Sequence, residues 1–148
     1  MLIGEYQHVV DDKGRVIIPT RLREQLGDRF VVTRGLDRCL FAYPLTTWEQ
    51  LGRRLNGLSF TQADVRAFSR LFFSGAVECI LDKQGRASLP TVLRDYAELE
   101  KEIVLVGVAD RLEIWSSVRW RAYADSAQET FETIAERLTA PDLHGPNG

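Results

Sequence analysis

The chain has 148 residues, of which 45% are hydrophobic and 27% charged, a balance typical of a globular protein. Its 5 Pro, 11 Gly and 2 Cys exclude collagen-like, low-complexity and disulfide-scaffold classes. The net charge is -2, and the longest apolar run, residues 103–108, is far shorter than the roughly 18–20 residues of a membrane span. We therefore expect a cytoplasmic protein with no membrane partner.

The first elements in chain order are expected to form a hairpin. An extended run at 6–11 meets a short polar turn containing Gly14, resumes at 15–18 and is stopped by Pro19. Pro19 opens a short helix near 21–26, which Gly27 closes. Two further strands are expected at 30–34 and 39–43, on either side of an Asp37-Arg38 turn.

Two helices are predicted next. The segment TTWE at 46–49 fits a capping box before a helix that ends at Asn56-Gly57. A second capping box, TQAD at 61–64, opens a helix through about Phe73. We expect Trp48 to belong to an apolar helix face and to pack in the core or between subunits.

The second half repeats the first. Residues 4–23 align without a gap on residues 75–94, a shift of 71, with identities that include Asp11/Asp82, Gly14/Gly85, Arg15/Arg86 and Arg23/Arg94. The same elements are therefore expected again, as strands at 77–82, 86–89, 103–108 and 112–115 with a helix at 92–99. One copy is too short to build a core alone, so the copies should pack as a pseudo-twofold unit.

The last predicted element is a long amphipathic helix. Its apolar residues recur every three or four positions and are Trp120, Tyr123, Ala124, Ala127, Phe131, Ile134, Ala135 and Leu138. The chain from Tyr123 onward carries a net charge of -4, with five acidic residues and one arginine. We expect the apolar stripe to pack on its own core or against the next subunit, away from any DNA, and the residues after Pro141 to fray.

These elements divide the chain into four segments. They are a first repeat at 4–50, a helical linker at 51–74, a second repeat at 75–117, and a C-terminal helix and tail at 118–148. The basic excess lies early, because residues 1–71 carry 11 basic and 8 acidic groups whereas residues 72–122 carry 7 and 8. A nucleic-acid surface should therefore be sought in the first half.

The sequence contains little that points to catalysis. Cys39, Cys79, His8 and His144 are too few and too scattered for a standard zinc site, so no metal and no cofactor is expected. No motif of a serine hydrolase, nucleotide-binding loop or metalloprotease occurs. A small hydrolase that uses Cys79 and His8 is the weakest of the functional hypotheses.

The repeated Asp-x-x-x-Arg pattern, with Pro closing the strand that the Arg opens, resembles the MraZ family, whose halves resemble the DNA-binding domain of AbrB and SpoVT. The resemblance implies an α+β fold in which two pseudo-symmetric AbrB-like swapped-hairpin β repeats form one β-barrel-like core with outer helices. It also implies a nucleoid-associated transcriptional regulator that assembles into ring-like homo-oligomers. Such regulators act on short G-rich direct repeats upstream of the division and cell-wall gene cluster, their own promoter included.

The site expected from this pattern centres on the two turns. Arg15 is expected to contact bases or phosphates of double-stranded DNA, because a rigidly held arginine can read guanine through two hydrogen bonds. The other expected DNA-binding residues are Lys13, Arg21, Arg23 and Arg86, and the residues expected to structure the motif are Asp11, Gly14, Asp82 and Gly85. No small-molecule substrate is expected.

The two copies differ at the turn and the strand that follows it. The second has Lys83-Gln84 and Ala87-Ser88 where the first has Asp12-Lys13 and Val16-Ile17, so we expect the first to dominate DNA binding. Arg34 and Arg38 are expected to form a solvated turn with Asp37. The alternative function is an antitoxin-like protein-interaction module with the same fold.

Overall fold

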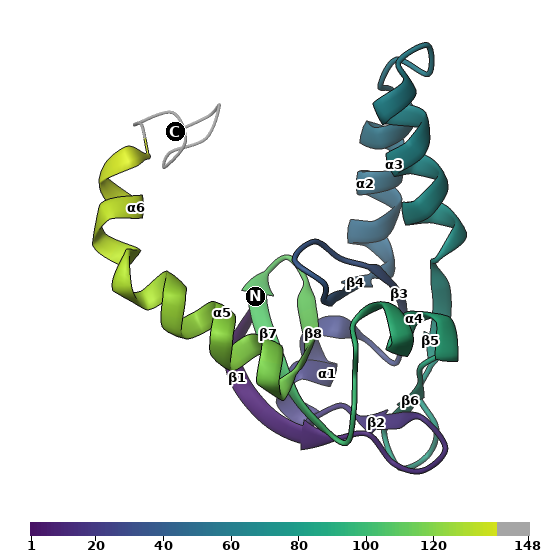
Figure 1. Cartoon of the computed structure of the whole chain (residues 1–148). Coiled ribbons are helices and arrows are strands. Elements are labelled where there is room, and N and C mark those ends of the chain that lie inside the picture. The colour runs from purple at the N-terminus through teal and green to yellow at the C-terminus, as the bar shows by residue number, and fades with distance from the viewer. Residues whose placement is uncertain (139–148) are drawn as a thin grey trace. The chain divides into compact units, whose positions relative to one another are not determined.

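The computed structural model describes residues 1–138 and divides the chain into two compact units, Met1–Ser117 and the segment that begins at Val118 (Figure 1). The described residues form a mixed α+β structure of antiparallel strands and helices. No helix among them is long and apolar enough to cross a membrane. The expected fraying after Pro141, and His144, lie outside the described residues.

The two sequence copies contain the same elements in the same order. The first copy consists of β1 (Leu2–Val9), β2 (Arg15–Ile17), α1 (Thr20–Leu26), β3 (Arg29–Arg34) and β4 (Leu40–Pro44). The second copy consists of β5 (Val77–Ile80), β6 (Arg86–Ser88), α4 (Thr91–Tyr96), β7 (Glu102–Ala109) and β8 (Leu112–Ser116). Gly27 ends α1 with a φ of 89°, as the sequence predicts.

The first two strands of each copy pair with strands of the other copy, whereas β3 pairs with β4, and β7 with β8, within one copy. The large sheet has the order β1-β7-β8-β4-β3-β5. The first strand of each copy therefore pairs with the third strand of the other copy, β1 with β7 and β5 with β3. The short strands β2 and β6 pair with each other in a separate ribbon. The order is symmetric about the β8–β4 pair, as expected for two similar halves.

The predicted hairpin within each copy is therefore wrong as a strand ladder. In the first copy only one bridge, Val10 to Val16, joins the arms of the turn. Val16 is fully buried, and it lies opposite Ala87, which is also buried. Pairing across the copies places both side chains in one shared core. A three-residue strand that folded back on its own copy could not bury its side chain in this way.

The core is built from both copies. It joins the strand and helix residues Val16, Ile18, Leu22, Leu26, Ala87, Leu89 and Leu93 to the inner face of the sheet, including Phe30, Val32, Leu105 and Ile114. All are at most 3% exposed. Neither copy has a core of its own.

A helical hairpin lies between the two copies in the sequence and projects from the β structure (Figure 1). It consists of α2 (Leu45–Asn56) and α3 (Ala63–Ser74), and Trp48 packs its ring 5.4 Å from that of Phe72. The helices lie where the sequence predicts them, but neither capping box forms. Pro44 caps α2 instead, and the Thr61 hydroxyl lies 2.8 Å from the Ser59 hydroxyl rather than binding a helix amide.

The C-terminal unit contains two helices where the sequence predicts one. α5 (Ser117–Glu129) ends before Thr130, whose N–H donates to the Ala127 carbonyl, and α6 (Phe131–Arg137) begins after it. The break interrupts the expected apolar stripe. No residue of either helix is buried, and Phe131 is 70% exposed. The expected packing of the stripe on its own core or against the next subunit stays a prediction.

A close approach of two backbones gives a test of the exchanged pairing. Gly107 lies opposite Gly4 in the β1–β7 ladder, and a Cβ at position 107 would lie 2.6 Å from the Ile3 Cα. Gly107→Ala should push β1 away from β7 and lower the free energy of unfolding by about 1–3 kcal/mol in urea titrations. Gly57→Ala is the control, because its Cβ would come no closer than 3.4 Å to its neighbours. Equal stability of the two variants would contradict the tight β1–β7 contact.

Candidate nucleic-acid interface

Each copy presents a tight turn held by an aspartate. In the first, Asp11 Oδ1 accepts the backbone N–H groups of Lys13 and Arg15, both at 2.9 Å. The Gly14 N–H donates to the Asp11 carbonyl, and Gly14 has a φ of 76°, which favours glycine. The predicted role of Asp11 in closing the turn therefore has a direct geometric basis.

The same aspartate fixes the direction of the arginine. Arg15 Nε donates to Asp11 Oδ2 at 2.7 Å, and Arg86 Nε donates to Asp82 Oδ2 at the same distance in the second copy. Asp82 Oδ1 likewise accepts the N–H groups of Gln84 and Arg86. Within the described residues, the Nη atoms of Arg15 and Arg86 make no hydrogen bond, so both guanidinium groups are oriented while their ends are free to donate.

The hydrogen bonds shift the titration of both carboxyl groups. The backbone N–H of Arg15 is the largest cause that lowers the pKa of Asp11, and its guanidinium contributes further. The backbone N–H and side chain of Arg86 lower the pKa of Asp82 in the same way. Because each pKa is lower in the folded chain, this stabilisation is present above the ordinary aspartate pKa and is lost as the pH falls through the lowered pKa.

The β2–β6 ribbon brings the two arginines to one face. Val16 and Ala87 point into the core, so their neighbours along each strand point outward. The outward pairs are Arg15 opposite Ser88 and Arg86 opposite Ile17. Ile17 is 49% exposed. The outer face of the ribbon therefore displays two oriented arginines around an exposed apolar side chain.

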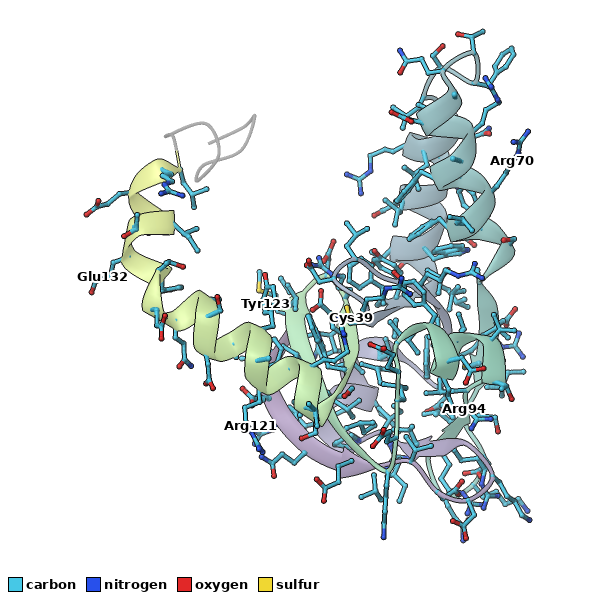
Figure 2. The ribbon with its side chains drawn as sticks, in the orientation of Figure 1. Cys39, Arg70, Arg94, Arg121, Tyr123 and Glu132 are labelled. Carbon is cyan, nitrogen blue, oxygen red and sulfur yellow. The ribbon has the colours of Figure 1, made fainter. Side chains whose placement is uncertain are left out.

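The exchange between copies changes the surroundings of Arg23. The sequence places Arg21 and Arg23 near Lys13, but the Arg23 guanidinium lies over Gly85, where a Cβ would be 2.7 Å from its Nη1. Its counterpart Arg94 covers Gly14 in the same way, and Figure 2 shows Arg94 close to the turns. Arg23 thus accompanies the second turn and not the first, because each helix packs against the turn of the other copy.

The remaining candidate DNA-binding residues differ in how exposed they are. Arg23 is partly buried and bonds Thr20 Oγ1, so much of it serves to cover the turn, whereas Lys13, Arg21 and Lys83 are exposed. Arg94 and Lys83 are not among the DNA-binding residues expected from the sequence. The Arg23/Arg94 identity in the repeat was the available signal for Arg94.

The Arg34–Arg38 turn is not only a solvated turn. The Tyr96 hydroxyl donates to the Gly35 carbonyl, and the Arg38 guanidinium lies 5.1 Å from the centre of the Tyr96 ring. Arg34 Nη1 donates to the Leu71 carbonyl at 2.7 Å. Tyr96 and Arg38 thus hold a loop of the first copy against α4, and Arg34 holds the same loop against α3.

The cysteines have the properties of core residues. Both are buried and reduced, and burial raises the pKa of the Cys79 thiol to about 11 and that of Cys39 still further. A protonated thiol is a poor nucleophile. Among the described residues, no hydrogen bond joins Cys79 to His8 and no cluster of His, Cys, Asp or Glu could hold a metal ion.

The backbone N–H of Arg15 lowers the pKa of Asp11 more than the Arg15 side chain does, so removing that side chain should raise the pKa only in part. In Arg15→Ala the backbone N–H groups still donate to Asp11, so its pKa should rise toward the ordinary value without reaching it. Carbon-detected NMR titration of the carboxyl groups would measure this, with Asp82 as the internal control that does not move. A pKa of Asp11 that stays constant, or returns fully to the ordinary value, would contradict the bonding described above.

Comparison with known proteins gives a consistent result. The family model described as "MraZ protein, putative antitoxin-like" matches the chain twice, at residues 1–71 and 72–141. The chain is 56% identical over 138 residues to the transcriptional regulator MraZ of Halothermothrix orenii, covering 93% of this chain and 96% of that one. It is 54% identical to the protein of that name from Moorella thermoacetica, covering 97% and 100%.

A third relative shows the same extent of similarity. The transcriptional regulator MraZ of Pelotomaculum thermopropionicum is 56% identical over 143 residues, covering 97% of this chain and 99% of that one. The duplicated turn, its two Asp–Arg pairs and the tandem family match all describe the same pair of repeats. The chain belongs to the MraZ family.

Proposed function

We propose that this protein is a transcriptional regulator, not an enzyme, and that it binds double-stranded DNA with the outer face of the β2–β6 ribbon. The names of its relatives support the regulatory role. The observation that carries the DNA-binding face is the pair Arg15 and Arg86, each fixed through Nε by an aspartate and both on one side of one ribbon.

The chemistry of this face suits the major groove. A two-stranded β ribbon fits the width of that groove, and an arginine can donate two hydrogen bonds to O6 and N7 of guanine. With Nε engaged by the aspartate, the two Nη groups remain to make that pair of bonds. Ile17, which lies opposite Arg86, can contact a base methyl group, which is a second means of reading sequence.

The surrounding cations position the ribbon on phosphates. Lys13 and Lys83 lie at the two turns, Arg21 is exposed on α1, and Arg23 on the same helix lies beside the second turn. The second turn thus gathers Lys83, Arg86 and Arg23. This removes the basis for expecting the first copy to dominate, and we propose that both copies contribute to one DNA-binding surface.

The pairing between copies supports the finer fold assignment. We assign the core as two AbrB-like swapped-hairpin repeats in one barrel-like unit, because β1 and β5 each pair with the other copy and β2 pairs with β6. The segment boundaries proposed are 4–50, 51–74, 75–117 and 118–148. The boundaries at 74/75 and 117/118 lie at or next to an element end, whereas the boundary at 50/51 lies within α2 (Leu45–Asn56).

Assembly compensates for weak binding by one chain. The net charge of -2 and the few cations of one ribbon give a small electrostatic contribution to affinity. A ring-like homo-oligomer would present several ribbons to several tandem repeats and raise the effective concentration of each. The arginine pair supports G-rich repeats as targets. The family resemblance supports the promoter of the division and cell-wall gene cluster and an association with the nucleoid in the cytoplasm.

A second candidate is a module that neutralises a protein partner. The antitoxin-like description of the family model favours it. Gel-shift analysis of the protein with DNA from upstream of its own gene distinguishes the two. Specific binding supports the regulator, and no binding under conditions where the protein is folded supports the module.

The arginine pair gives a direct test of the ribbon. Arg15→Ala and Arg86→Ala should each weaken specific binding by about 1–3 kcal/mol per ribbon, a loss of roughly 5- to 150-fold, and relax the preference for guanine. Arg29→Ala is the control, because Arg29 lies on β3 and pairs with Glu78. Fluorescence anisotropy with guanine-substituted probes measures both effects. Unchanged affinity in both variants would exclude the ribbon as the reading element.

Salt dependence tests the use of several ribbons. The slope of log affinity against log salt concentration should be steeper for a probe with several tandem repeats than for one with a single repeat, because more counterions are released. Titrations between about 50 and 200 mM salt are sufficient to measure the difference. The same slope on both probes would show that only one ribbon engages DNA.

A further inference from the structure

The helical hairpin carries an open groove that the DNA-binding face does not use. We call it the hairpin groove. It runs between α2 and α3, and the residues that line it include Glu49, Gly52, Arg53, Asn56, Arg70 and Phe73. Gly52 leaves its floor bare, since the nearest atom to a Cβ there would be Phe73 Cε1 at 3.9 Å. Phe73 itself is 38% exposed.

The packing of the hairpin is incomplete in one chain. No residue of α2 is buried, and Phe72 is the one buried residue of α3. Trp48 packs on Phe72 and meets the edge of Phe73 at 5.6 Å, and of these three rings only Phe73 lines the groove. A helix pair with so little buried apolar surface is stable only where another element covers it.

The hairpin is also basic. Residues 45–74 contain Arg53, Arg54, Arg66 and Arg70 against Glu49 and Asp64, a net charge of +2. Arg53 and Arg70 are exposed on opposite walls of the groove. Arg66 is occupied elsewhere, because its Nη1 donates to the carbonyls of Phe60 and Thr61 in the loop between the helices. The groove therefore fits an apolar, acidic segment.

The same chain contains such a segment. Phe131 and Ile134 have the three-residue spacing by which a helix anchors itself in a groove, and Leu138 follows at the C-cap of α6; they are 70%, 43% and 45% exposed. Glu132 and Glu136 lie one turn apart beside this stripe and are exposed. Among the described residues neither glutamate forms an ion pair. Residues 123–138 carry a net charge of -3.

We propose that α6 of a second copy of the chain docks in the hairpin groove, with Phe131 against Phe73 and Gly52 and with Glu132 and Glu136 facing Arg53 and Arg70. A second hairpin groove is a poor occupant, because it would bring arginine against arginine. DNA is a poor occupant as well, since the exposed ring of Phe73 on the groove floor would gain nothing from phosphates. Charge and apolar spacing together select the acidic helix.

The contact joins two different surfaces, so it is heterologous. A heterologous contact repeated from copy to copy forms a ring when the rotation closes. The inference therefore rests on the ring-like homo-oligomer proposed above and names the surfaces that would build it. It leaves the β2–β6 ribbon outside the contact.

Charge reversal tests the contact and shows whether it is made between copies. One variant, Glu132→Arg with Glu136→Arg, makes the helix basic, and another, Arg53→Glu with Arg70→Glu, makes the groove acidic. Each alone should fall to a lower mass by light scattering at concentrations where the parental chain is assembled. An equal mixture of the two should regain the parental mass, because each helix then meets an oppositely charged groove on the other variant.

A chain with all four substitutions, one control variant and two further measurements complete the experiment. The fourfold variant should assemble by itself. Glu5→Arg with Glu102→Arg makes the same change of charge on β1 and β7 and should keep the parental mass. Circular dichroism verifies folding, and binding to a probe with a single DNA repeat should keep its base preference in every variant.

Each contrary result has one meaning. Parental mass in either twofold variant, or no assembly of the fourfold variant, would overturn the pairing. Assembly of the fourfold variant without recovery in the mixture would place the contact within one chain and overturn the proposal of a second copy. A monomeric parental chain would refute the ring, whereas an assembled parental chain unaffected by the reversals would refute only this contact.

Discussion

The pairing of β2 with β6 is the interaction on which the rest of the structure depends. Each strand has three residues and buries one side chain, Val16 or Ala87, which neither copy could shield alone. Two further bonds extend the pairing, from the Ile18 N–H to the Gly85 carbonyl and from the Leu89 N–H to the Gly14 carbonyl. Because these bonds cross between copies, the two halves form one core and are expected to fold together.

The same exchange builds the two turns. Arg94 covers Gly14 and Arg23 covers Gly85, so the helix of each copy supports the turn of the other. The aspartates then orient Arg15 and Arg86, whose ends remain free within the described structure. A rigid turn lowers the entropy that an arginine loses on binding, because its side chain is already ordered. The core and the proposed DNA surface thus depend on the same contacts.

The apolar surfaces outside the core have a different role. The hairpin groove and α6 both leave aromatic side chains exposed, Phe73 on one and Phe131 on the other, and their charges are opposite. A single chain cannot satisfy the hydrophobic faces that these elements carry. In the proposed arrangement the helices carry the assembly and the ribbon carries DNA recognition, so mutations should affect the two separately.

The sequence by itself determined the duplication, the positions of most strands and helices, the Asp–Arg turn and the family. These follow from local rules, since Gly14 and Gly85 need a positive φ, Pro19 and Pro90 open helices, and repeated residues show repeated structure. The break at Thr130 was not predicted, because the spacing of apolar residues continues through it.

Only the tertiary structure decided which strands pair and what Arg23 supports. The sequence predicts a hairpin in each copy, since adjacent strands joined by a tight turn usually pair with each other. Two similar copies offer each strand two similar partners, and the local pattern cannot choose between them. Burial of Val16 against Ala87 in one shared core makes that choice, and it moves Arg23 from the first turn to the second.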